Sequence, residues 1–375
     1  MDKRDTSVEF LRIMAMIIVI GCHVNAGSVY YDRVNPVGVG ISCLVADGVA
    51  VFWMIMGFFL FKSNYRHVLN RACKHVLIPM FAYTALMFYF GDWLAGDTDN
   101  LFFGFTRPLS DYKNLLMNGL LKWAPVVKYD RHFWFLYSYM IIILAFPALN
   151  GVVSVAKGKK NLLIMAGVLF GIIVVNDIGM NALAGFSHAP FNGALGGMFI
   201  VLIGYAVYSM KDLFEYNPVC SLLGLIGFFI VNLVRCRLQY NITLEGGSIH
   251  LLYWFSSFGI LNAFCLVLFA YGIKGLLDKK VIRKIVLHLG RVSMPVYFVH
   301  MLVLARLTNL GLIDKITAHL SDKYSSIILV HLAKMGLLFV SSLAVVEIYY
   351  WLKTIVLKVV RRNGNCGQRK LLTNG

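Results

Sequence analysis

Apolar runs of membrane length follow one another along almost the whole chain, separated by short segments that hold most of the charged residues. A run of about 20 mainly apolar residues is long enough to cross a bilayer as an α-helix. The pattern therefore predicts an all-α integral membrane protein, a bundle of about ten transmembrane helices. The predicted spans are 8–28, 39–61, 76–95, 133–153, 162–180, 193–210, 218–235, 251–273, 292–311 and 326–353.

The first run carries two polar residues inside an otherwise apolar helix, Arg12 and His23. Their spacing turns the helix by about 1100°, so both side chains leave it on nearly the same face, about 16 Å apart in depth. A charged group inside a span usually faces a protein-lined or water-filled cavity. Both residues also have a plain interpretation, in which Arg12 snorkels to the head groups and His23 lies in the interface.

The second run holds an aspartate, Asp47, well inside its apolar stretch. This run returns through the membrane, so Asp47 and His23 are expected at similar depths below the outer surface. A carboxylate at that place orients a catalytic imidazole or raises its basicity. The alternative is that Asp47 caps a helix or bonds another side chain.

The segment after the second run is basic and contains Lys62, Arg66, Arg71 and Lys74. Arg71 and Lys74 are three positions apart, so they project together from a helix. Arginine presents a planar fork of donors that suits phosphate oxygens, and such a pair beside the membrane suits a phosphate-bearing ligand from the cytosol. The competing interpretation is that these basic residues only set the orientation of the chain, as basic residues in cytoplasmic loops commonly do.

Aromatic residues gather where the longest outer segment, 96–132, meets the next span, and His132 and Trp134 lie at that boundary. Such residues form the usual interfacial belt of a membrane protein. They also suit a lip that binds sugars, whose apolar faces stack on aromatic rings. A further histidine, His300, lies in the middle of the ninth span. It is a functional candidate or a packed, hydrogen-bonded core residue.

Composition agrees with a membrane protein: 59% of the residues are hydrophobic and 14% charged, against about a quarter charged in soluble domains. The net charge of +17 comes largely from the loops between spans, with no compact basic domain or nucleic-acid motif. Nucleic acid is therefore not an expected partner. The seven cysteines are scattered, without CxxC pairs or ligand spacing, so no disulfide framework and no metal site are expected.

The basic residues also set the orientation. An even number of spans puts both termini on one side, and that side carries about twice as many basic residues as the other. We therefore expect both termini in the cytoplasm. This count assigns Arg235 to an outer segment, 235–250. Residues 1–358 are expected to form one membrane domain and 359–375 a short basic cytoplasmic tail, with no fused soluble domain.

Several motifs resemble those of the membrane acyltransferase 3 family, over nearly the whole chain. Arg12 and His23 match its Arg-x10-His first helix, and DGVAVFWMIMGFFLF resembles its second helix. The other matches are RACKHVLIP, with Arg71, Lys74 and Pro79, then HFWFL at 132–136, and SMPVYFVH ending at His300. Two positions differ, because Met56 replaces the serine before Gly57 and Lys74 replaces an arginine.

The resemblance implies a membrane-bound O-acyltransferase of a bacterial inner membrane, with acetyl-coenzyme A as cytosolic donor. The acceptor would be a hydroxyl of a cell-surface or lipid-linked glycan such as an O-antigen, capsule or exopolysaccharide. The donor phosphates are expected at Arg66, Arg71 and Lys74, with Arg12 beside them. His23 would act as general base with Asp47 orienting it, and the glycan would contact the residues of the outer aromatic lip and the ninth span, His132, Trp134 and His300.

Three kinds of alternative stay open from the sequence: a variant of the transfer reaction, a transporter, and a regulatory or scaffold subunit. An acyl-histidine intermediate replaces direct transfer, or succinyl replaces acetyl, without any change in these motifs. A multi-span transporter or flippase of a glycan or small anion would also line its path with buried charges. Against it, no internal repeat relates the two halves of the chain, as many transporters show. A regulatory or scaffold subunit is the third alternative. Such a role does not require polar residues inside the membrane, where their burial is costly.

Overall fold

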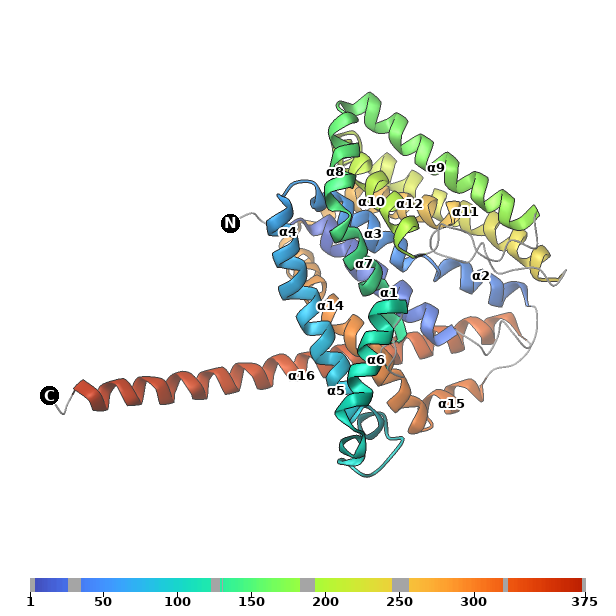
Figure 1. Cartoon of the computed structure of the whole chain (residues 1–375). Coiled ribbons are helices and arrows are strands. Elements are labelled where there is room, and N and C mark those ends of the chain that lie inside the picture. The colour runs from blue at the N-terminus through green and yellow to red at the C-terminus, as the bar shows by residue number, and fades with distance from the viewer. Residues whose placement is uncertain are drawn as a thin grey trace.

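The computed structural model describes residues 4–25, 35–122, 129, 131–182, 193–244, 256–319 and 323–372. Within these ranges the chain is helical throughout and contains no strand (Figure 1). The all-α architecture is therefore confirmed. The outer ends of the predicted spans 8–28 and 251–273, and the last residues of the predicted tail, lie partly outside the described residues.

The first half of the chain contains α1 to α8, with the shorter turns η1 to η3 between them. Their bounds are α1 (Thr6–Asn25), α2 (Pro36–Leu44), α3 (Gly48–Leu60), α4 (Tyr65–Ala72), η1 (Cys73–Leu77), α5 (Ile78–Ala95), η2 (Phe103–Thr106), α6 (Leu109–Lys122), η3 (Arg131–Phe133), α7 (Trp134–Leu144) and α8 (Phe146–Val155). Within this half η1 is a π-helical turn, whereas η2 and η3 are 3₁₀ turns.

The second half contains α9 to α16. Their bounds are α9 (Lys159–Ala182), α10 (Ala194–Ser209), η4 (Lys211–Leu213), α11 (Pro218–Leu244), α12 (Ser257–Gly272), α13 (Lys274–Leu277), α14 (Lys280–Asn309), α15 (Leu312–Thr317) and α16 (Tyr324–Leu372). In Figure 1 the last turns of α16 extend past the other helices, on the side of the bundle where α1 begins.

Seven helices or continuous helix pairs of the described chain are long and apolar enough to cross a membrane. An eighth crossing is counted if α7 and α8, which meet at a bend of 60°, form one broken span. The two remaining predicted spans correspond to α10 and α12, which are apolar but only 16 residues long. The chain is a multi-span helical membrane protein by length and composition.

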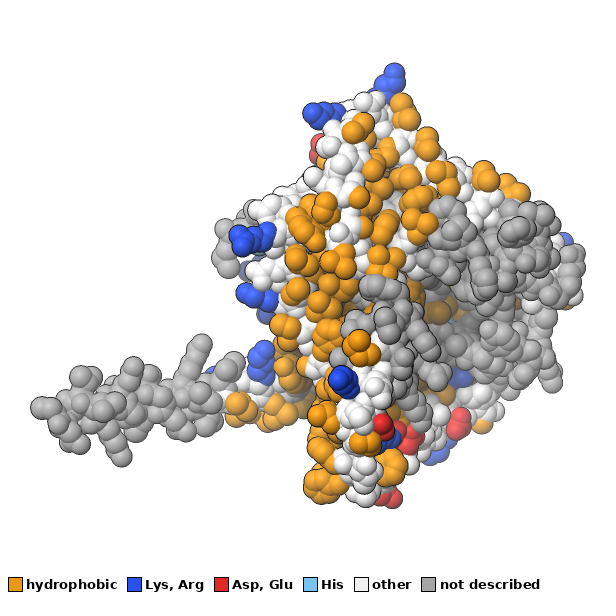
Figure 2. Space-filling view, in the orientation of Figure 1, with side chains coloured by type: hydrophobic (Ala, Val, Ile, Leu, Met, Phe, Trp, Pro, Cys, Tyr) orange, Lys and Arg blue, Asp and Glu red, His pale blue; other side chains and the backbone are white. Residues whose placement is uncertain are grey.

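The surface supports this conclusion. Figure 2 shows hydrophobic side chains covering the middle of the visible face and basic side chains along its left and upper edges. Many large apolar residues of the outer helices are exposed, among them Val175 of α9, Leu233 of α11 and Leu329 of α16. Lipid rather than water is the natural solvent for such a surface, because burial of each apolar side chain is worth about 1.5–3 kcal/mol.

The centre of the bundle depends on a close crossing of α3 and α10. Gly57 of α3 lies against the backbone of α10, so that a Cβ built on it would be 2.1 Å from the carbonyl oxygen of Val201. On the other helix, a Cβ on Gly204 would lie 2.4 Å from the carbonyl oxygen of Met54. Small residues permit this approach, as is common between helices in membranes.

Replacing Gly57 by alanine is expected to destabilise the fold by about 1–3 kcal/mol, because the added methyl group must push two helix backbones apart. The measurement is the temperature at which the detergent-purified protein loses its monodisperse gel-filtration peak, which should fall. Gly167→Ala on α9 is the matched control, since a Cβ there meets no heavy atom within 4 Å. An equal response of the two variants would contradict the close crossing.

Candidate active site

Helix α1, which carries Arg12 and His23, packs along α14. Near the start of α1, Glu9 accepts a hydrogen bond from Arg12 Nη1 at 3.0 Å, and Glu9 lies so close to Gly290 of α14 that a Cβ there would be 2.3 Å from its carboxylate. Near the end of α1, the ring of His23 lies 5.1 Å, centroid to centroid, from that of His300 of α14. Glu9 and His23 therefore contact α14 near the two ends of α1, and Arg12 is joined to this contact through Glu9.

Glu9 joins two arginines at the first turns of α1. Glu9 is buried, with 3% of the residue exposed. Its carboxylate forms ion pairs of 2.6 Å with Arg4 Nη2 and 3.0 Å with Arg12 Nη1. Arg4 also donates to the carbonyl oxygen of Leu287 on α14. The role of Glu9 is absent from the sequence-based prediction, although its position three residues before Arg12 is the spacing of a helical ion pair. Arg12 is therefore held by a carboxylate of its own helix.

Three histidines from distant parts of the chain converge at the other end of α1. His300 lies between the other two, with ring centroids 5.1 Å from His23 and 4.7 Å from His132, while His23 and His132 are 6.4 Å apart. They come from α1, η3 and α14. His132 and His300 are buried, at 3% and 0% exposure. The structure thus brings together three of the residues that the sequence singles out.

Tyr297 of α14 fixes two members of this histidine cluster. Its hydroxyl donates to the backbone carbonyl oxygen of His132 at 2.5 Å, which ties η3 to α14. Its own carbonyl oxygen lies 2.7 Å from Nδ1 of His300, one turn further along the helix. This double role gives the tyrosine and histidine of the SMPVYFVH segment a physical reason for their spacing. Trp134, the first residue of α7, is half-buried and follows His132 of the cluster by two positions in the chain.

Asp47 lies at the break between α2 and α3, which interrupts the single helix predicted for residues 39–61. Its Oδ2 accepts hydrogen bonds from Arg235 Nη1 at 2.8 Å and from the amide of Asn262 at 2.6 Å. Arg235 also donates to the carbonyl oxygen of Cys43, at the end of α2. No hydrogen bond or ion pair joins Asp47 to His23 among the described residues: in place of the predicted pair, Asp47 bonds to Arg235 of α11 and Asn262 of α12.

Arg235 is the partner that the sequence-based topology assigns to an outer segment. In the structure α11 continues to Leu244, so Arg235 lies inside the helix and is 0% exposed. Asp47 is 1% exposed, and the two form a fully buried ion pair. Such a pair compensates two desolvation penalties with one attraction and several hydrogen bonds. In a sequence, an arginine near the end of an apolar run indicates a buried ion pair only when its carboxylate partner is already known.

The three residues predicted to bind the donor, Arg66, Arg71 and Lys74, are exposed. Arg66 and Arg71 lie on α4 and Lys74 on the π-helical turn that follows it. Figure 1 shows α4 at the end of the bundle where the chain begins, away from the C-terminal end of α1. These cations and the histidine cluster therefore occupy opposite ends of the bundle, as the spans require.

A second charged network holds the start of α1 to the turns after α10 and α12. Lys274 forms ion pairs with Asp5 at 3.7 Å and with Glu215, which Lys211 also approaches at 3.3 Å. Burial alone would raise the pKa of Glu215, but the hydrogen bonds and charges of Lys274 and Lys211 outweigh it and lower this pKa. The network is internally neutralised, so it is a structural clamp rather than a free anion site.

Near the C-terminal end of α5, Tyr129 joins two aspartates. Its hydroxyl donates to Asp92 at 3.0 Å and contacts Asp97, whose other oxygen accepts from Asn309 of α14 at 2.6 Å. Burial and the hydrogen bond to Asp97 raise the pKa of the Tyr129 phenol. Arg107 forms an ion pair with Asp92. These contacts hold the C-terminal ends of α5 and α14 together.

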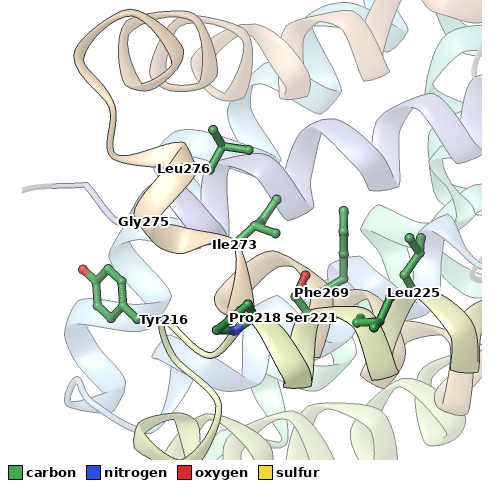
Figure 3. Close-up of a pocket in the computed structure, with 10 residues that line it drawn as sticks. Tyr216, Pro218, Ser221, Leu225, Phe269, Ile273, Gly275 and Leu276 are labelled. Atoms are coloured by element: carbon green, nitrogen blue, oxygen red, sulfur yellow. The ribbon is translucent and has the colours of Figure 1, made fainter.

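An apolar groove of about 390 Å³ lies elsewhere, between the start of α11, the end of α12 and α13 (Figure 3). Tyr216 lies at one edge, and Leu225 and Phe269 line it. None of the residues predicted for the site lines this groove. In the described ranges, no group of three or more His, Cys, Asp or Glu side chains is arranged to hold a metal ion.

Comparison with known families matches residues 5–351 to the acyltransferase 3 family, described as an acyltransferase domain. The match spans most of the chain, including Glu9, Arg12, Asp47 and the three clustered histidines. A multi-span helical bundle with this match is a membrane acyltransferase, and the chain belongs to the acyltransferase 3 family. Searches of curated proteins and of solved structures return no significant match.

Proposed function

We propose that this protein transfers an acetyl group from cytosolic acetyl-coenzyme A to a hydroxyl of a cell-surface or lipid-linked glycan, with His23 as general base. The observation that carries the proposal is the placement of His23: it lies in a cluster with His132 and His300, at the end of α1 opposite the exposed cations of α4. Family membership supplies the acyltransferase class.

The donor would bind at the basic end of the bundle. Arg71 and Lys74, with Arg66 one to two turns earlier, are exposed and free to meet the phosphates of coenzyme A. Arginine and lysine bind phosphate oxygens through charge-assisted hydrogen bonds. Arg12, about 16 Å below His23 along α1, marks the path of the pantetheine arm, whose extended length is comparable.

The proposed reaction has two steps at His23. An imidazole nitrogen of His23 takes the proton of the glycan hydroxyl while the hydroxyl oxygen attacks the thioester carbonyl carbon, which gives a tetrahedral intermediate. The intermediate collapses with cleavage of the carbon–sulfur bond, and the coenzyme A thiolate takes this proton from His23. The products are the O-acetyl glycan and free coenzyme A. His132 and Trp134 would contact the sugar at the outer lip.

This reaction fits a particular orientation. We place both termini of the chain in the cytoplasm of a bacterial inner membrane, with α10 and α12 completing ten crossings. The excess of basic residues in the segments on the N-terminal side supports this orientation. The donor then arrives from the cytosol at α4, and the glycan arrives from the outer face at η3.

Replacing Arg71 by glutamine is expected to raise the KM for acetyl-coenzyme A about 10-fold and to leave kcat nearly unchanged, because one charge-assisted hydrogen bond to phosphate is worth about 1.5–3 kcal/mol before solvent screening. Steady-state kinetics of the purified enzyme would measure it. Lys160→Gln, an exposed cation at the start of α9, is the matched control. An unchanged KM in Arg71→Gln would contradict the donor site.

A further inference from the structure

Lys334 is a cation buried inside a membrane-length helix. It lies on α16, nine residues into the apolar stretch Ser325–Val356, and only 5% of the residue is exposed. Its ammonium group forms no ion pair or side-chain hydrogen bond with any residue that the structure describes. Asp314 of α15 is near enough for its charge to act on Lys334, but the two do not form an ion pair. An unpaired cation at such a place is costly and indicates a functional site.

His331 adds a second polar group, one helical turn before Lys334. It is 8% exposed, and its Nε2 is buried without a hydrogen-bond partner in the described ranges. Residues three positions apart share one face of a helix. The two side chains are also near enough for the charge of Lys334 to act on the imidazole. Two polar groups that lack a protein partner therefore lie together on one face of α16.

This face of α16 points into the bundle. Leu338, one turn after Lys334, packs in a buried cluster with Val24 of α1 and Val303 of α14. Leu329, by contrast, is 64% exposed and belongs to the lipid-facing side of α16. Lys334 and His331 therefore lie between helices, on the side of α16 that meets α1 and α14.

Lys334 also lies at nearly the same depth as His23. A Cβ on Gly21 of α1 would be 3.1 Å from the sulfur of Met335, so these two residues are level with each other. Figure 1 shows α16 running toward the side of the bundle where α1 begins, so the two helices run in opposite directions. His23 follows Gly21 by two residues and Lys334 precedes Met335 by one, which moves both toward the same end, by about 3 Å and 1.5 Å. His331 lies about 4.5 Å further toward that end.

The chemistry of the pair selects an anion, and its place in the membrane selects a lipid. Phosphate oxygens accept charge-assisted hydrogen bonds from lysine, and a neutral imidazole donates through one N–H. A charged group of a water-soluble polysaccharide would have to leave water to reach Lys334. A lipid phosphate is already held at the membrane surface, and long lysine side chains extend toward that level.

We propose that Lys334 and His331 bind the phosphate of a lipid-linked glycan and so bring the sugars attached to it to the depth of His23. The proposal rests on the proposed function, in which His23 activates a glycan hydroxyl. It narrows the acceptor to a glycan carried on a lipid phosphate, in place of a finished polysaccharide at the cell surface.

Binding of a sugar-free lipid phosphate tests the site without turnover. The probe is a long-chain polyprenyl phosphate, added to the detergent-purified full-length protein and measured by native mass spectrometry. We expect about 10-fold weaker binding in Lys334→Met and about 3-fold weaker binding in His331→Leu. Lys353→Met, which removes an exposed cation of the same helix, is the matched control and should bind as wild type does.

Three results of this experiment would overturn the inference. The first is equal affinity of wild type and Lys334→Met for polyprenyl phosphate. The second is equally tight binding of phosphatidylglycerol, which would make the site one for ordinary lipid head groups. The third is loss of the monodisperse gel-filtration peak in Lys334→Met, because removal of an unpaired buried charge with retention of its apolar stem should not destabilise the fold.

Steady-state kinetics separate this inference from the proposed function. With a lipid-linked glycan as acceptor, Lys334→Met should raise the KM for the acceptor about 10-fold and leave the KM for acetyl-coenzyme A unchanged. If polyprenyl phosphate binding depends on Lys334 but wild type transfers no acetyl group, the proposed function fails and the lipid phosphate site stands. If wild type acetylates the glycan with the same acceptor KM as Lys334→Met, the proposed function stands and this inference fails.

Discussion

His23→Ala should abolish acetyl transfer while leaving the protein folded and in the membrane. His23 lies in the last turn of α1, at the edge of the histidine cluster beside the buried His300, so its loss removes the base without opening the core. Removal of a general base typically costs 10²–10⁴-fold in rate, which here means an O-acetyl signal at background. Mass spectrometry of the cell-surface polysaccharide, counting the mass of one acetyl group per repeat unit, measures this.

The matched control is Cys22→Ala, the preceding residue of α1, which is an exposed thiol. Its side chain leaves the helix about 100° away from that of His23. Both variants must be present at wild-type abundance in the membrane fraction. A polysaccharide that is acetylated as fully with His23→Ala as with wild type would show that His23 is not the base.

Breaking the buried ion pair of Asp47 and Arg235 is expected to have a large effect on the stability of the protein. Asp47→Ala leaves the guanidinium of Arg235 buried without its carboxylate, and breaking such a pair costs about 3–5 kcal/mol. We expect the variant to lose most of its folded, detergent-stable fraction, as measured by fluorescence-detected gel filtration after a temperature series.

The control for this pair is the double variant with Asp47→Asn and Arg235→Met. It removes both charges and keeps an apolar stem in the place of Arg235, and replacement of a whole buried pair is often nearly neutral. The double variant should therefore recover much of the stability that Asp47→Ala loses. If Asp47→Ala is as stable as wild type, the ion pair does not hold the break between α2 and α3.

The arrangement of α1 could be predicted because it depends on local geometry alone. The relative positions of Arg12 and His23 follow from the turn per residue of a helix, and α1 does pack along α14, through Glu9 near one end and His23 near the other. The same local argument could have found Glu9, since it precedes Arg12 by three residues. His132 and His300 were recognised as candidates one at a time.

The contacts between distant segments could not be predicted in this way. Similar counted depths predict His23 as the partner of Asp47, whereas Asp47 forms its ion pair with Arg235, 188 positions away in the chain. Depth fixes only one coordinate of a side chain in a bundle. The helix packing order fixes the other two, and it places α2 against α11 and α3 against α10 and α12 around this pair. The break at Asp47 follows from the same packing.

The central claim is that the acetyl group enters at the basic end of the bundle and leaves at the histidine end. Proteoliposomes with the purified protein in one known orientation test it, with membrane glycolipid as acceptor and [¹⁴C]acetyl-coenzyme A supplied on one side at a time. Label should enter the glycolipid only when the donor is on the side of Arg71. Labelling only from the opposite side, or transport of unmodified glycolipid with no labelling at all, would contradict the account.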